Sequence, residues 1–206
     1  LPEHRLVAAH LDHAMRPCSR GDADWVRGLC RAWRIPLRDH RLADPPADEA
    51  GARRARYAFL EEVRCAEGAA AVLTAHHADD QAETVLHRAA RGTGLRGLGG
   101  IRPYRAPGIW RPLLQASGEE LAAYARAVGL AWREDPTNLG PGPRNVLRHE
   151  ILPRLEEAVA PGARAALAGL ARRAREEEAA WEEALPRLLE PLRVRGERGR
   201  EVSFLR

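Results

Sequence analysis

Short apolar runs alternate with longer amphipathic segments through the first half of this chain, and no other feature restricts its fold as strongly. Three runs have the length and composition of strands, and three segments carry apolar residues at helical spacing. In chain order, these strands and helices are predicted at residues 5–11, 22–34, 35–42, 47–67, 69–76 and 78–91. Alternating strands and helices form a parallel sheet, because each crossover connection carries a helix. We therefore expect an α/β fold, a doubly wound and mostly parallel sheet with helices on both faces.

The third predicted strand and the helix after it are the most clearly marked part of this pattern. Residues 69–76 form a continuous apolar run, AAAVLTAH, which is typical of a strand buried on both faces. The helix at 78–91 then begins with Asp79 and Asp80 in its first turn, where negative charge is favoured, and Gly92 lies just past its end. The polar cluster HHADD therefore falls at the junction between a strand and a helix.

The second half of the chain is predicted to be mainly helical. Ser117 and Glu120 have the spacing of a capping box, and Gly129 is placed to end the helix that they begin. A loop rich in Pro, Gly, Asp and Asn follows, and helical patterns then occupy residues 144–159 and about 163–192. The predicted domains are an α/β domain at residues 1–142 and a helical region at 143–206.

Composition restricts the class of protein only broadly. The 206 residues are 45% hydrophobic and 30% charged, and no apolar run approaches the roughly 20 residues that a membrane span needs. The three cysteines are widely spaced and form no paired motif, which favours a reducing, cytoplasmic location and no membrane partner. The net charge of +4 is compatible with a nucleic-acid partner. All 33 basic residues are arginine, which a GC-rich genome also explains.

Two polar clusters should meet at one edge of the predicted sheet. HLDHAMR, residues 10–16, follows the first strand, and HHADD, residues 76–80, follows the third. Ligands of parallel sheets bind outside the carboxyl ends of the strands. The aspartate pair has two interpretations: oxygen ligands for Mg²⁺ held with substrate phosphates, or a helix cap and a favourable charge at the helix dipole. Zinc is disfavoured because neither a nearby cysteine nor an HExxH motif is present.

Two further motifs offer sites for anions. Arg144 and Arg148 lie four residues apart beside a helix start, which suits a phosphate site or, alternatively, a solvated interdomain loop. The segment RGTGLRG, residues 91–97, matches GxGxxG but follows a helix instead of a strand, which argues against a dinucleotide site. It is interpreted as a helix stop and flexible loop, or as a loop that exposes backbone N–H groups to phosphates.

Taken together, seven segments in this order and spacing resemble the tRNA(Ile)-lysidine synthase family of N-type ATP pyrophosphatases. They are HLDHAMR (10–16), ARRARY (52–57), TAHHADDQAET (74–84), RGTGLRGL (91–98), RPLL (111–114), EDPTN (134–138) and RNVLRH (144–149). The resemblance implies ATP-dependent ligation of free L-lysine to C2 of the wobble cytidine in a tRNA(Ile) with a CAU anticodon, through an adenylated tRNA. It also implies ATP and Mg²⁺ as cofactors, and it leaves a homodimer open.

The resemblance assigns roles residue by residue. The catalytic residues would be Asp80, Arg144 and Arg148, with Asp80 also binding the metal. Free lysine would be bound by Glu83, Arg53 and Arg56, and tRNA by Arg111, Asn145 and the helical C-terminal region. ATP would be bound by Asp12, His13, Arg16, His77, Arg91, Gly92, Thr93 and Gly94.

One expected motif is missing from these residues. The family's phosphate loop, SGGxDS, would precede residue 1, and none of Ser19, Ser117 and Ser203 lies in such a loop. We therefore expect an N-terminally truncated α/β domain with little ATP pyrophosphatase activity from these residues alone. The alternatives are a non-catalytic tRNA-binding remnant, a tRNA thiolase of the same superfamily and a metal-dependent phosphohydrolase. The thiolase is disfavoured because paired cysteines are lacking.

Overall fold

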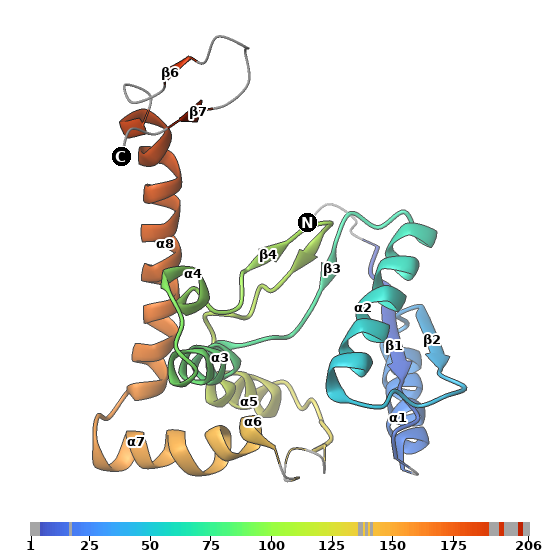
Figure 1. The fold of residues 1–206 in the computed structure, drawn as a ribbon. Helices are drawn as coiled ribbons and strands as arrows, with labels where there is room; N and C mark the ends of the chain where they lie inside the picture. Colours follow the sequence, from blue (N-terminus) through green and yellow to red (C-terminus); the bar gives the residue numbers. More distant parts are fainter. Residues whose placement is uncertain are drawn as a thin grey trace. The chain divides into compact units, whose positions relative to one another are not determined.

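The computed structural model separates into two compact units, which are described in turn (Figure 1). The first unit contains residues 1–73 and 105–110, and the second contains residues 74–104 and 111–206. The structure describes residues 5–16, 18–135, 138, 140 and 142–189, together with the backbone of two short strands at 194–195 and 202–203.

The first unit begins with the predicted strand–helix–strand arrangement. β1 (Ala8–Asp12) pairs in parallel with β2 (Leu37–Arg41), and α1 (Ser19–Ala32) connects them. α2 (Glu49–Ala66) follows, and both α1 and α2 contact β1. The parallel pairing and the crossover helix confirm the α/β class for this part of the chain.

A second, smaller parallel pair also belongs to this unit. β3 (Val72–Leu73) pairs with β5 (Ile109–Trp110) in a sheet of order β3-β5-β4, in which β4 is Tyr104–Arg105. The prediction that residues 69–76 are a strand buried on both faces is wrong, because β3 has two residues and Leu73 is 62% exposed. Alanines occupy much of the run and bury little area. The described strands therefore form separate small sheets, and a single continuous sheet is not seen among them.

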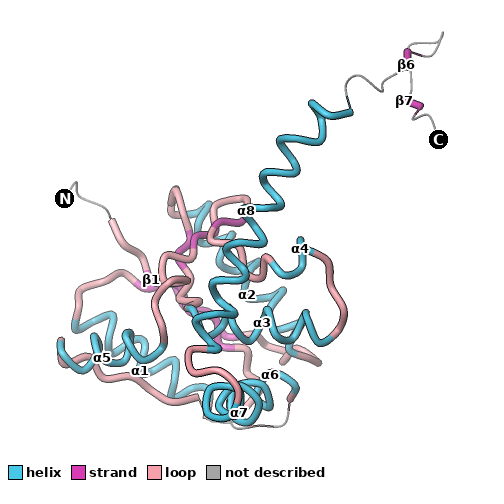
Figure 2. Tube along the Cα trace, turned by 90° about the vertical axis from the view of Figure 1, so that its left-hand side faces the viewer, coloured by secondary structure: helices cyan, strands magenta, loops and turns pink. Residues whose placement is uncertain are grey.

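In the second unit, α3 (Ala78–Ala90) packs against α8 (Ala163–Leu189) and α4 (Leu95–Leu98), as Figure 2 shows. Small side chains make this close approach possible: Ala82 on α3 and Ala171 and Ala174 on α8 are buried. Val85 fills the core beside them with no exposed surface. The long helical pattern predicted from residue 163 is thus confirmed, and its first half anchors α3.

The remaining helices of the second unit follow the sequence signals closely. In α5 (Gly118–Ala127), Ser117 and Glu120 form the predicted capping box, and Gly129 has φ +69° just past the helix. α6 (Pro143–Val146), a π-helical turn at Leu147–Ile151 and α7 (Leu152–Ala158) occupy the predicted helix at 144–159. The predicted domain boundary between residues 142 and 143 stays a prediction.

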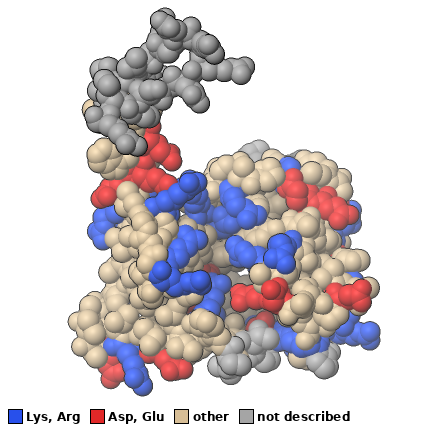
Figure 3. Space-filling view, viewed as in Figure 1, with Lys and Arg blue, Asp and Glu red and all other residues tan. Residues whose placement is uncertain are grey.

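Basic side chains gather over α4 and the middle of α8, and acidic side chains lie further along α8 (Figure 3). Arg96 and Arg102 both pair with Glu178, with N–O distances of 3.6 and 3.0 Å. β6 (Val194–Arg195) and β7 (Val202–Ser203) pair antiparallel. Within the described residues, no helix combines the length and the apolar character that crossing a membrane requires.

Candidate functional site

The start of α3 is fixed by a capping box made from the HHADD motif. The ring of His77 accepts a hydrogen bond from the N–H of Asp79 at 3.3 Å, and the carboxylate of Asp80 accepts one from the N–H of His77 at 3.0 Å. His77, rather than Asp79, is therefore the N-cap residue. Asp79 instead accepts a hydrogen bond from the N–H of Gly118 at 3.2 Å. These contacts hold Asp80 rigidly at the helix start.

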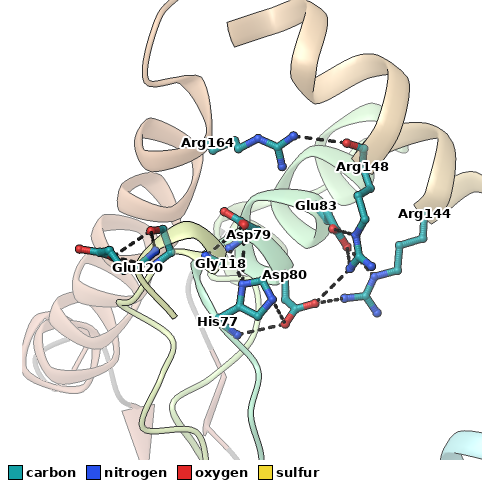
Figure 4. A network of polar contacts seen from close by, with 10 residues as sticks. His77, Asp79, Asp80, Glu83, Gly118, Glu120, Arg144, Arg148 and Arg164 are labelled. Carbon is teal, nitrogen blue, oxygen red and sulfur yellow. Dashed lines mark hydrogen bonds and ion pairs between the residues drawn. The ribbon is translucent and has the colours of Figure 1, made fainter. Parts of the chain in front are cut away.

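Glu83 lies one turn further along α3 and meets two arginines from the α6–α7 segment (Figure 4). Arg144 donates from Nε to Glu83 at 2.7 Å and from Nη2 to Asp80 at 2.8 Å. Arg148 donates from Nε and Nη2 to the two oxygens of Glu83, at 2.5 and 3.1 Å. We call Asp80, Glu83, Arg144 and Arg148 the carboxylate–arginine cluster.

Burial explains why this cluster is so closely paired. Glu83 is only 1% exposed, and an ionised carboxylate is costly to bury unless it is paired and hydrogen-bonded. The hydrogen bond to Glu83, followed by the attraction of that carboxylate and of Asp80, raises the pKa of Arg148 despite its burial. Two negative carboxylates and two positive guanidiniums thus balance each other's charge. The structure brings together all three residues predicted to be catalytic and one predicted to bind lysine, and their roles stay predictions.

The cluster does not form a ready site for Mg²⁺ at Asp80. One oxygen of Asp80 accepts from the N–H of His77, and the other accepts from Arg144. Within the part of the chain that the structure describes, no group of three or more His, Cys, Asp or Glu residues is placed to bind a metal ion. A divalent ion at Asp80 would have to displace a guanidinium, so the described residues do not fit the predicted metal site.

Asp12, predicted to bind ATP, lies at the carboxyl end of β1 in the first unit. It is buried, pairs with Arg41 and accepts a hydrogen bond from the N–H of Ala14 at 2.9 Å. Burial would raise the pKa of Asp12, but hydrogen bonds from Ala14, Ser19 and Arg41 together lower it. Arg16, another predicted ATP residue, pairs with Asp22 at 2.6 Å.

Two histidines flank Asp12 and are unusual in their hydrogen bonding. Nε2 of His10 and Nδ1 of His13 are buried and have no hydrogen-bond partner within the described part of the chain. Burial lowers the pKa of both side chains, and the charge of Arg56 further lowers that of His13. Both rings are therefore neutral at pH 7, and each has a buried ring nitrogen without a partner in the described residues, near the carboxyl end of β1.

These lowered pKa values predict that the protein loses stability in mild acid. The unfolded chain takes up protons near pH 6.5 and the folded chain only at lower pH, so the free energy of unfolding falls as the pH drops below about 6.5. The slope is at most about 1.4 kcal/mol per pH unit for each histidine. Urea unfolding between pH 7.5 and 5.5 measures this, and replacing His10 and His13 with asparagine should flatten the curve. An unchanged slope in that double variant contradicts the prediction.

Arg53 and Arg56, predicted to bind lysine, lie on α2 around Tyr57. Arg53 donates to the hydroxyl of Tyr57 at 3.4 Å and lies 4.9 Å from the ring centre. Arg105 stacks over the same ring at 4.2 Å. These arginines belong to the first unit and Glu83 to the second, so a shared role in binding lysine stays a prediction.

The Gly-rich loop is more ordered than its sequence suggests. Arg91, Gly92, Thr93 and Gly94 are exposed, and Gly92 has φ +73° at the end of α3. Residues 95–101, in contrast, contain α4 and are bound by three buried or half-buried side chains. Arg88 donates to the carbonyls of Gly97 and Gly100, Arg175 to those of Gly99 and Ile101, and Gln81 to that of Ile101. These hydrogen bonds order the end of the segment 91–97 and the residues after it, whereas residues 91–94 are exposed.

The two residues predicted to bind tRNA are placed differently from each other. Arg111 is 4% exposed, and its Nη1 donates to the carbonyl of Arg102 at 2.6 Å. This burial leaves the side chain of Arg111 little surface for a contact with RNA, and its role in binding tRNA stays a prediction. Its apolar neighbours in the sequence, IW and PLL, indicated burial. Asn145 is half-buried and donates to the carbonyl of Gly140 at 2.8 Å.

Gln81 is a structural residue that the sequence reasoning missed. Its side chain is 2% exposed, accepts the N–H of Ile101 at 2.6 Å and donates to the carbonyl of Ile101 at 3.0 Å. This pairing joins α3 directly to the end of the Gly-rich loop. One signal was available: Gln81 lies four residues before Val85, on the helix face that is buried.

A model of the PP-loop domain family matches residues 2–155, and the chain therefore belongs to this family. The curated relatives that match this chain have a more specific name than the family, tRNA(Ile)-lysidine synthase. A Thermus thermophilus protein is 46% identical over 198 residues, which are 90% of this chain and 38% of the relative. The Solibacter usitatus protein is 41% identical over 188 residues, 89% of this chain and 42% of the relative. The chain thus spans about two fifths of the length of these relatives.

A solved structure shares the fold. It is a U34-tRNA thiolase from Methanococcus maripaludis with a [4Fe-4S] cluster, and it matches with a TM-score of 0.69 at 18% identity. The match covers 85% of this chain and 63% of that one. At this identity the likeness concerns the fold alone. Cys18, Cys30 and Cys65 are free in the present structure.

Proposed function

We propose that this chain is part of a tRNA(Ile)-lysidine synthase. The enzyme would join free L-lysine to C2 of the wobble cytidine in a tRNA(Ile) with a CAU anticodon, in an ATP-dependent reaction. The observation that carries the proposal is the carboxylate–arginine cluster, which unites two motifs 61 residues apart in a chain that is 46% identical to a named synthase. Membership of the PP-loop family supports the use of ATP.

The chemistry needs a leaving group on the base and a neutral amine. The C2 carbonyl oxygen attacks the α-phosphate of ATP and pyrophosphate departs. A lysine nitrogen then bonds to C2, loses its proton, and AMP leaves with the former carbonyl oxygen. Free lysine carries both ammonium and carboxylate groups, and the cluster carries charges of both signs. An ammonium would take the place of a guanidinium at Glu83, and the released guanidinium would pair with an anionic group. Asp80, Arg144 and Arg148 lie beside Glu83 and would act at the reacting atoms.

The proposed nucleotide site uses the carboxyl end of β1. His10 and His13 each offer a buried ring nitrogen without a hydrogen-bond partner in the described residues, which fits a ligand rich in donors and acceptors. Asp12 and Arg16 lie in the same segment. The contribution of Arg91, Gly92, Thr93 and Gly94, which belong to the second unit, stays a prediction. Mg²⁺ stays a prediction, and we derive no step from it.

For tRNA, the exposed arginines of α4 and α8 are better placed than Arg111. The side chain of Arg96 is 86% exposed, and those of Arg102 and Arg172 are also exposed. Figure 3 shows basic side chains gathered beside α8. Arginine binds phosphate as a planar fork of donors, and contacts of this kind make RNA binding depend on salt concentration. We propose that this surface contacts the RNA backbone.

Transfer of labelled lysine to RNA tests the proposed function. Protein from the complete gene should attach lysine to a tRNA(Ile) transcript with a CAU anticodon only when ATP is present, with AMP and pyrophosphate released in equal amounts. A transcript with uridine at the wobble position is the matched control and should accept no lysine. ATP-dependent sulfur transfer instead of lysine attachment, or lysine attachment to both transcripts alike, would contradict the proposal.

A further inference from the structure

The main-chain carbonyl of Arg148 lacks its usual helical hydrogen bond. Arg148 lies in the π-helical turn Leu147–Ile151, and the N–H of Leu152, which would bond to Arg148 in an α-helix, bonds to the carbonyl of Leu147. In the π-helical register the donor would be the residue five further on, which is Pro153 and has no N–H. Neither register therefore supplies a helical donor to this carbonyl.

A side chain from another helix provides the missing donor. Nη2 of Arg164, in the first turn of α8, lies 3.3 Å from the carbonyl oxygen of Arg148 (Figure 4). Arg164 is in turn fixed by Glu156 of α7, whose carboxylate accepts the N–H groups of Arg164 and Gly162 at 2.6 and 3.0 Å. These two backbone hydrogen bonds lower the pKa of Glu156, so it stays ionised. The α7–α8 corner thus presents a guanidinium at a defined position.

This contact restricts the direction in which the Arg148 side chain leaves the helix. The carbonyl and the side chain leave the same residue, so fixing the peptide plane restricts where the guanidinium lies. An α-helix turns by roughly 100° per residue. If the π-helical turn lost its extra residue and became α-helical, Arg148 would therefore rotate about the helix axis by roughly this angle. Its two hydrogen bonds to Glu83, at 2.5 and 3.1 Å, would then be lost.

We propose that Arg164 is a positioning residue, which holds the π-helical turn so that Arg148 is directed at Glu83 before lysine binds. The proposal rests on the proposed function, since it assumes that Glu83 and Arg148 act on lysine. Arg164 itself touches neither carboxylate. Misplacing a group by about 1 Å is enough to weaken a site strongly, so a distant contact of this kind has a measurable effect.

Kinetics of Arg164 variants provide the first test. Arg164→Ala should raise the KM for lysine about tenfold with kcat changed less than threefold, as expected for one lost hydrogen bond in the support of a charged group. Arg164→Lys keeps a charged donor and should restore most of the affinity. Arg154→Ala, an exposed arginine on α7, is the matched control and should behave as wild type. An unchanged KM in Arg164→Ala, in an enzyme that does attach lysine, overturns the proposal.

Urea unfolding separates this inference from the proposed function. Arg164→Ala should lower the unfolding midpoint, and at least half of that loss should disappear in a Glu83→Gln background, because Arg148 bonds to both residues. Additive losses overturn the proposal whether or not lysine is a substrate. Failure of the wild-type enzyme to attach lysine would instead refute the proposed function, and the unfolding cycle would still decide the role of Arg164. If Glu83→Gln does not fold, the comparison of Arg164→Ala with Arg164→Lys decides.

Discussion

Replacing Glu83 with glutamine should reduce lysine attachment about 100-fold and lower the free energy of unfolding by about 2 kcal/mol. Glutamine keeps the shape of the side chain but removes the charge that pairs with Arg144 and Arg148 at 2.7 and 2.5 Å. Both arginines are partly exposed, so water compensates them in part and the stability loss stays below that of a fully buried pair. Labelled-lysine transfer and urea unfolding, measured on the same preparation, give the two effects.

The comparison with Glu157→Gln makes this prediction specific. Glu157 is exposed on α7, so its replacement changes the net charge by the same amount without touching the cluster. Both activity and unfolding should then match wild type. If Glu83→Gln attaches lysine at the wild-type rate, the predicted effect on activity is wrong. If its stability nevertheless falls, Glu83 stabilises the fold but does not bind lysine.

Replacing Gln81 with leucine should destabilise the second unit by about 2–3 kcal/mol, although the two side chains have similar volume. The substitution leaves the half-buried N–H of Ile101, which now donates to Gln81 at 2.6 Å, without this partner. Denaturant unfolding followed by circular dichroism measures the loss. Gln115→Leu is the control, because Gln115 is the other glutamine of the chain and is exposed.

The same contact can be tested from its opposite side. A Cβ added at Gly100 would lie 2.6 Å from the side-chain oxygen of Gln81, and Gly100 also has φ +60°. Gly100→Ala should therefore destabilise the protein, and less so in the Gln81→Leu background, where the amide oxygen is absent. Equal losses in both backgrounds would show that backbone strain alone explains the effect of Gly100→Ala.

Features that depend on a few consecutive residues were predicted well from the sequence. The capping box of Ser117 and Glu120 and the left-handed Gly129 follow from contacts within one helical turn, and the structure has all of them. α3 begins and ends within one residue of its predicted limits for the same reason. Burial of β3 was predicted wrongly, because burial depends on which neighbours cover a strand, and its own residues do not encode them.

The candidate site divides in the same way between local and distant information. The sequence by itself determined that two carboxylates share one face of α3 and that two arginines share one face of a later helix, because both follow from the helical repeat. Only the tertiary structure decided that these faces meet, that Asp80 has both oxygens engaged, that Arg111 is buried and that Arg164 donates to the carbonyl of Arg148. The physical reason is that a partner 61 residues away is selected by the packing of α3 on α8 and the path of α6 and α7, which no local pattern specifies.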